Sequence, residues 1–87
     1  MDKENFKNIA IHCKTEKEAI ACCNLADKLG LKWMSAHRFS EINNWKDFRE
    51  KTAYVFYEGT YADFKNCKTC GCKIHYAPWF LKNFEIK

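Results

Sequence analysis

The chemistry-bearing residues of this chain concentrate between Cys67 and Cys72, where the sequence reads Cys-Lys-Thr-Cys-Gly-Cys. Three of the chain's six cysteines lie in this segment. Two residues between Cys67 and Cys70 let a tight turn present both sulfurs to one zinc ion, and the glycine that follows allows the open backbone conformation that such a turn needs. The pattern therefore predicts a structural Zn²⁺ site of the zinc-knuckle type, with Cys67, Cys70 and Cys72 as ligands.

The fourth ligand of a closed, four-coordinate zinc site is expected to be His75, which follows the cysteine segment closely. Cys13 or His12, at the end of the first predicted strand, could supply this ligand instead. Two other interpretations of the segment stay open. Cys67 and Cys70 could form a redox dithiol, although such a pair needs its first thiol at a helix N-terminus and this segment is predicted to join two strands. The cysteines could also be reduced surface thiols or be joined by an adventitious disulfide.

The other cysteines fit the interior of the protein better than a reactive site. Cys22 and Cys23 lie within the apolar stripe of a predicted helix, where a free cysteine behaves as a small hydrophobe. Cys13 is next to His12, but neighbours on a strand point to opposite faces and are poorly placed to share a proton. The sequence has no glycine-rich phosphate loop, no metal-hydrolase helix motif and no Ser/His/Asp pattern. We therefore expect a protein that is not an enzyme.

The elements that must position these residues follow from capping and periodicity. Thr15 and Glu18 form a capping box, and apolar residues then recur at helical spacing until Gly30, so a helix is predicted over residues 16–29. Alternating or β-branched segments predict strands over residues 7–13, 31–34, 52–58, 61–66 and 73–76. A short helix or turn is expected within 41–51, a loop over 67–72, and a short final helix that Pro78 opens.

Together these elements predict one α+β domain of two layers over residues 1–87. Links such as Gly59-Thr60 are too short for parallel crossovers, so the sheet of about five strands should be mostly antiparallel, with one main helix packed on it and a zinc-knuckle loop at one end. A composition of 47% hydrophobic and 30% charged residues excludes a disordered tail. No apolar run approaches the ~18 residues of a membrane span.

The N-terminal residues and the net charge indicate where and with what the chain acts. The first residues carry charges of both signs and lack the apolar stretch of a signal peptide, so we expect a protein of the cytoplasm, where disulfides are rare. Fifteen Lys and Arg against eleven Asp and Glu leave a net charge of +4, which permits a nucleic acid or an acidic protein as partner without demanding either.

Aromatic side chains are in surplus for a chain of this size. A small domain can hardly bury all of them, so we expect several to face outward, namely Trp45, Tyr57, Tyr61, Trp79 and Phe80. The first four of these, with Lys65, Lys68 and Lys73, form the expected partner-binding set. Exposed aromatic residues beside cationic ones are typical of protein-binding hot spots and also of single-strand nucleic-acid platforms. The alternative is that the aromatic residues only form a rich core.

The sequence resembles a group of small proteins encoded by phages and prophages of Gram-positive bacteria. The segments that carry the resemblance cover most of the chain: residues 11–19, 25–30, 32–35, 52–56, and 73–76 leading into Phe80 and Leu81. They consist of fold-forming residues, so the resemblance implies a fold more than an activity. Relatives of this type lack the cysteine cluster of residues 67–72, which marks the cluster as a specialisation of this chain.

The resemblance also implies a function. The phage-like pattern, the mild positive charge and the zinc-type knuckle together resemble anti-CRISPR proteins, which inhibit a CRISPR effector nuclease by binding it. The expected function is thus a non-catalytic, zinc-binding inhibitor that contacts a CRISPR-Cas nuclease in the cytoplasm of the host bacterial cell. Two alternatives stay open. One is a zinc-containing nucleic-acid-binding module that uses Lys65, Lys68, Lys73 and nearby aromatic residues, and the other is an oligomeric sponge for a signalling nucleotide.

Overall fold

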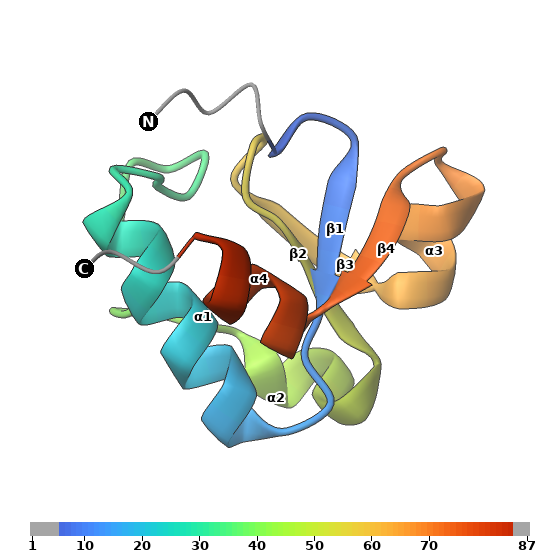
Figure 1. The fold of residues 1–87 in the computed structure, drawn as a ribbon, viewed down its shortest axis with the longest axis horizontal. Helices are drawn as coiled ribbons and strands as arrows, with labels where there is room; N and C mark the ends of the chain where they lie inside the picture. Colours follow the sequence, from blue (N-terminus) through green and yellow to red (C-terminus); the bar gives the residue numbers. More distant parts are fainter. Residues whose placement is uncertain (1–5, 85–87) are drawn as a thin grey trace.

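A four-stranded sheet organises residues 6–84, which are the residues that the computed structural model describes (Figure 1). The strands are β1 (Ile9–His12), β2 (Thr52–Val55), β3 (Thr60–Asp63) and β4 (Lys73–Tyr76), in the spatial order β3-β2-β1-β4. β1 pairs antiparallel with β2, and β2 pairs antiparallel with β3, whereas β4 runs parallel to β1. The α+β class is confirmed, and the sheet is mixed. The first five residues, where no signal peptide was expected, lie outside the described part.

The expectation of five strands is wrong for the described residues, and the missing strand is the segment 31–34. Its backbone groups bond to turns instead of to a ladder. Trp33 N donates to the His37 carbonyl at 2.9 Å, and Met34 N donates to the Gly59 carbonyl at 3.1 Å. The segment thus runs past the β2–β3 turn as an irregular strap. β-propensity could not reveal this, because a strand forms only where a neighbouring strand pairs with it.

Two helices lie on one face of the sheet. α1 (Glu16–Lys28) begins where the Thr15 hydroxyl accepts a hydrogen bond from Glu18 N at 3.1 Å, which confirms the predicted cap. α4 (Ala77–Asn83) has Pro78 in its first turn, as predicted. Figure 1 shows α1 and α4 packed against each other beside the sheet. The short α2 (Trp45–Phe48) and the 3₁₀ turn η2 (Arg49–Lys51) confirm the short helix or turn expected before β2.

Another helix, α3 (Phe64–Thr69), packs against the opposite face of the sheet. The expectation of a two-layer domain with one main helix is therefore also wrong. The strand expected over 61–66 ends at Asp63, because its carboxylate accepts from Lys65 N at 2.8 Å and caps a helix there. Cys67 therefore lies in a helix, and the loop expected over 67–72 is reduced to a turn after Thr69.

The two faces of the sheet carry separate buried clusters. Strand alternation sends Ile11 and Tyr54 to one face and Ala10 and Ala53 to the other. The α1-side core contains Phe6, Ile11, Cys13, Ala19, Cys22, Cys23, Leu25, Ala26, Leu31, Trp33, Phe39, Tyr54, Phe56, Ala77 and Phe80. The α3-side cluster contains Ala10, Ala53, Val55 and Cys67. Across residues 6–84, no helix is long and apolar enough to cross a membrane.

Candidate binding groove and thiol cluster

The end of α3 brings three cysteines to one turn. Cys67 is buried on the inner side of α3, Cys70 is exposed just after the helix, and Cys72 is half-buried before β4. Backbone bonds hold this geometry: Cys70 N donates to the Asn66 carbonyl and Cys72 N to the Cys67 carbonyl, each at 3.0 Å. Gly71 has φ +94°, which a residue with a side chain rarely adopts, so the glycine of the motif does what the sequence analysis expected of it.

A small cavity of about 140 Å³ lies beside this turn. It is lined by Val55, Glu58, Thr60, Ala62, Asn66, Cys67, Cys70 and Cys72. Glu58 comes from the turn between β2 and β3, and no sequence motif connects it with the cysteines. As they stand, the side chains of residues 6–84 include no group of three or more His, Cys, Asp or Glu placed to hold a metal ion.

The expected fourth ligand, His75, is not brought to the cysteines. In the parallel ladder His75 is the register partner of Ile11, which belongs to the α1-side core. The His75 ring stacks on Trp79 of α4, with centroids 3.7 Å apart and planes at 14°. Cys67 packs with Ala10 in the α3-side cluster. The sheet itself therefore lies between the His75 ring and the Cys67 thiol.

Neither of the two alternative ligands lies at the cysteine turn. Cys13 is fully buried in the α1-side core. His12 is on the α3 side but stacks on Phe64, at the start of α3, with ring centroids 4.3 Å apart. Cys70 follows the other end of that helix. The structure thus places each of the three predicted fourth ligands away from the cysteine turn.

Burial raises the pKa of two thiols of this cluster. It raises the pKa of Cys67 to about 11, with smaller contributions from the neighbouring Cys72 and Cys70 thiols and from Asp63. Burial, Glu58 and Cys70 also raise the pKa of Cys72. The thiolate is the nucleophilic form of cysteine, so these groups are not activated for attack.

A groove of about 390 Å³ opens between α3 and β4 on the same side of the sheet. Its lining residues are Phe64, Lys68, Cys72, Lys73, Ile74 and Tyr76. No acidic residue of the described chain lines it, and two lysines do. Tyr76 is 48% exposed, and Lys14 Nζ lies 4.8 Å from the centroid of its ring. The groove therefore combines a cationic rim with an accessible aromatic face.

His12 supports this groove from beneath. Its side chain is only 5% exposed, stacks on Phe64 and lies 5.3 Å from the Tyr76 ring, centroid to centroid. Nε2 donates to the Glu50 carbonyl at 2.6 Å, which fixes the orientation of the ring. Nδ1 is buried and has no hydrogen-bond partner among residues 6–84. The ring thus forms a rigid aromatic wall beneath the groove. The sequence did not indicate this role, because it presents His12 only as a neighbour of Cys13 and as a possible zinc ligand.

The expected partner-binding residues do not form one surface. Phe80 is fully buried, so its expected exposure is wrong. Trp45 is half-buried and donates from Nε1 to the Cys13 carbonyl at 3.1 Å, and the Tyr61 hydroxyl donates to Asp47. Trp79 stacks on His75 on the α1 side of the sheet. Lys65, Lys68 and Lys73 are exposed on or next to α3, and only Lys68 and Lys73 line the groove.

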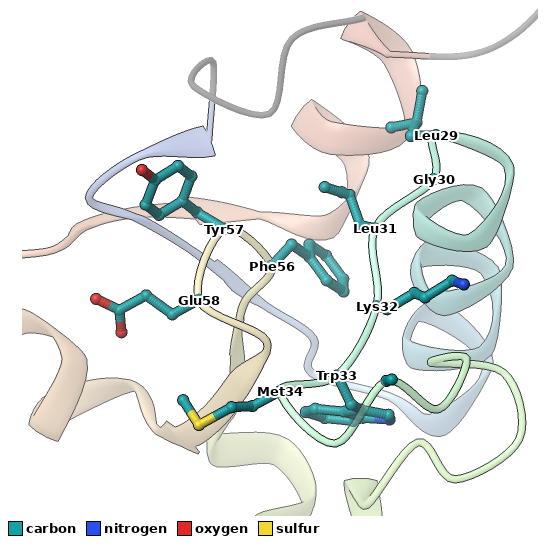
Figure 2. Close-up of a pocket in the computed structure, with 10 residues that line it drawn as sticks. Leu29, Gly30, Leu31, Lys32, Trp33, Met34, Phe56, Tyr57 and Glu58 are labelled. Carbon is teal, nitrogen blue, oxygen red and sulfur yellow. The ribbon is translucent and has the colours of Figure 1, made fainter.

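Another pocket, of about 530 Å³, lies between residues 29–36 and the β2–β3 turn (Figure 2). Tyr57, one of the expected partner-binding residues, lines it. In Figure 2 the oxygen atoms of Tyr57 and Glu58 lie on the side opposite the Lys32 nitrogen. A ligand site needs a few polar groups that converge on one point. The α3–β4 groove, in comparison, has Lys68 and Lys73 among its lining residues and none of the described acidic residues.

Comparison with models of known protein families, with curated proteins and with solved structures finds no match for this chain. Its function must therefore be argued from the groove and the thiol cluster themselves.

Proposed function

We propose that this chain is a non-catalytic binding protein that holds a short stretch of single-stranded nucleic acid in the α3–β4 groove. The observation that carries the proposal is a groove that is lined by Lys68, Lys73 and the exposed Tyr76 and by none of the described acidic residues. Lysines attract phosphates, and an exposed aromatic ring stacks on an unpaired base.

The cationic groups come from three different parts of the chain. Lys68 belongs to α3, Lys73 to β4, and Lys14 to the segment between β1 and α1. Lys14 already lies over one face of the Tyr76 ring at cation–π distance. A base that stacks on Tyr76 would thus have its phosphate within reach of lysines on more than one element. A single strand suits this geometry, because bases in a duplex are not free to stack on a side chain.

The same site supports binding without catalysis. Phe64, Ile74 and Tyr76 supply apolar and aromatic surface, and the lysines supply charge. Burial raises the pKa of Cys72, and this disfavours the nucleophilic thiolate form of the one thiol that lines the groove among the described residues. No carboxylate lines it to act as a general base.

The inhibitor of a CRISPR-Cas nuclease implied by the phage resemblance stays a prediction. That function needs a protein-binding surface, and the aromatic residues expected there all belong to or pack against the α1-side core, so none of them lines the α3–β4 groove. The groove, in contrast, concentrates aromatic and basic groups at one place. Direct protein binding would be favoured if inhibition of the host nuclease persisted after the groove lysines were removed.

Fluorescence anisotropy with a fluorescein-labelled oligothymidylate of ~10 nucleotides tests the proposal. Three phosphate contacts predict a slope of about −2 for log K against log salt, and hence roughly twentyfold weaker binding at 200 mM than at 50 mM NaCl. The double variant Lys68→Ala/Lys73→Ala should lose most of the affinity and much of the slope. Tyr76→Ala should weaken binding by about 1–3 kcal/mol while leaving the slope unchanged.

A matched control removes the same charge from another part of the molecule. Lys17→Ala/Lys28→Ala changes two exposed lysines on α1, which packs on the opposite face of the sheet. This variant should bind the oligonucleotide nearly as well as the unchanged protein. Equal losses in the two double variants would show that net charge alone causes binding, and the absence of binding at 50 mM NaCl would overturn the proposal.

A further inference from the structure

The cavity beside the groove gathers more potential metal ligands than the local sequence pattern contains. Cys67, Cys70 and Cys72 line it together with Glu58. The first three are neighbours in sequence, but Glu58 arrives through the tight β2–β3 turn. Three sulfurs and one carboxylate oxygen are a donor set that a tetrahedral Zn²⁺ site can use.

We propose that the chain binds one Zn²⁺ in this cavity through Cys67, Cys70, Cys72 and Glu58, and that His75 takes no part. The structural reason is the position of each group relative to the sheet. The four ligands share the wall of one cavity, whereas the His75 ring is stacked on Trp79 on the far side of the sheet. Moving His75 to the thiols would require β4 to leave its register with β1, and this register extends over all four β4 residues.

The four side chains are not placed to hold an ion as they stand, so closing the site would require them to rotate. Cys70 and Glu58 are both exposed at the cavity rim, so each can turn inward without disturbing the core. The backbone turn is already in place, with Gly71 at φ +94° and the Cys72 amide bonded to the Cys67 carbonyl. Each cysteine loses its proton to water when it binds the ion, so binding releases protons. Lys68 and Lys73, next to the turn, offset the resulting negative charge.

The ion would have a mechanical consequence. It would join the end of α3, the start of β4 and the β2–β3 turn at one point. The α3-side cluster has four buried residues, with Ala62, Phe64, Cys72 and Ile74 partly buried against it, which is a smaller core than the one beneath α1. Lys68 and Lys73 flank the ligands, and Cys72 lines both the cavity and the groove. Zinc would thus order the rim at which the nucleic acid is proposed to bind.

The first test is cobalt substitution together with elemental analysis. Protein saturated with Zn²⁺ and freed of excess should contain one zinc per chain, and Co²⁺ should produce the d–d absorption and the sulfur-to-cobalt charge transfer of a tetrahedral thiolate site. Mutation of a residue that only hydrogen-bonds to a metal ligand weakens metal binding by ~10–100-fold. Cys70→Ser removes a direct ligand, so it should weaken zinc binding by more than that. Glu58→Gln should weaken it by roughly tenfold or more. Both residues are exposed, so circular dichroism should show an intact fold.

His75→Ala and Cys22→Ala are the controls. Cys22 is a buried thiol of the α1-side core, and His75 lies on that same side. Both variants should keep one zinc with unchanged affinity. Failure of the unchanged protein to bind Zn²⁺ would overturn the inference. So would loss of zinc in His75→Ala with retention in Glu58→Gln, because His75 would then be the fourth ligand.

The metal and the nucleic acid are tested separately. Zinc binding is measured without oligonucleotide, and the anisotropy titration is repeated on protein treated with a chelator. If the unchanged protein bound no added Zn²⁺ but still bound the oligonucleotide, the proposed metal site would be wrong and the proposed groove would stand. Zinc binding without any oligonucleotide binding would do the reverse.

Discussion

The two faces of the sheet differ sharply in how they are packed. The α1-side core contains fifteen buried residues, and the largest fully buried side chains, such as Tyr54, Phe56 and Phe80, belong to it. The α3-side cluster contains four, and two of them are alanines. Burial of apolar surface is the main favourable contribution to folding. The α1 side therefore holds the fold together.

The lightly packed side carries the chemistry. The groove, the thiol cluster and the exposed Tyr76 all lie with α3. A helix of six residues is marginal by itself, because helix nucleation is unfavourable and few hydrogen bonds follow it. A region held by few contacts can adjust to a ligand or a metal ion at low cost. The comparison thus separates a stabilising face from a binding face.

Adjacent residues of one segment test this separation most strongly. Phe56 is buried in the α1-side core, and Val55 is buried in the α3-side cluster. Phe56→Ala should lower the free energy of unfolding by about 3–5 kcal/mol. Val55→Ala removes two methyl groups and should lower it by about 2 kcal/mol or less. Urea unfolding followed by circular dichroism measures both. Equal losses would contradict the unequal role of the two faces.

Alkaline unfolding provides the second test. The pKa of Cys13 is raised by its hydrogen bond to Cys22 and by burial, and burial raises the pKa of Tyr54 and that of Cys23, the latter to about 12. These groups favour the folded state below their unfolded pKa values, 9.0 for cysteine and 10.0 for tyrosine, and the benefit is lost as pH rises toward the folded values.

Each such group should remove up to ~1.4 kcal/mol of stability per pH unit over its window. The three groups named lie in the α1-side core, whereas the α3-side cluster contains Cys67, with the partly buried Cys72 packed against it. Cys67→Ala should therefore reduce the alkaline loss less than Cys13→Ala/Cys23→Ala does. Unfolding in urea at pH 8, 9, 10 and 11 measures the slopes. If Cys67→Ala reduced the fall of the unfolding free energy with pH more than Cys13→Ala/Cys23→Ala did, the unequal role of the two faces would be contradicted.

The two helix caps give the smallest effect and the finest distinction. Thr15 caps α1 and Asp63 caps α3, each through one hydrogen bond to a backbone amide. Thr15→Ala and Asp63→Ala should each cost about 1 kcal/mol. Only Asp63→Ala should markedly speed the alkylation of the buried thiol beneath its helix, Cys67. The rates are read by peptide mass spectrometry after iodoacetamide treatment, with Cys22 under α1 as the reference thiol. Equal acceleration of both thiols would show that α1 and α3 are held equally.

Local signals predicted several elements correctly. The capping box at Thr15 predicted α1, the β-branched and aromatic segment after Lys51 predicted β2, and Pro78 predicted α4. Each signal acts over a few residues, so it is fully present in the sequence. The strand expected over 61–66 failed for a related reason. Asp63 is a strong helix cap as well as a member of an alternating pattern, and the cap prevailed.

The long-range features could not be derived in this way. Sequence spacing assigned His75 to the thiols, but the parallel pairing of β4 with β1 placed its ring on the other face. Glu58 has no motif that links it to cysteines, and only the β2–β3 turn brings it to their cavity. The expected exposure of Phe80 failed because α4 packs its inner side onto the α1-side core.

By itself the sequence determined the composition of the thiol cluster, its turn at Gly71, the α+β class and the elements with strong caps. Local hydrogen bonds form the caps and the turn, and residue patterns along short segments indicate the class. The tertiary structure decided which residues share a face, a groove or a cavity. Side chains alternate along a strand, so one register choice moves a residue such as His75 from one side of the sheet to the other. That choice depends on pairing with distant strands, and the binding groove and the fourth zinc ligand depend on it in turn.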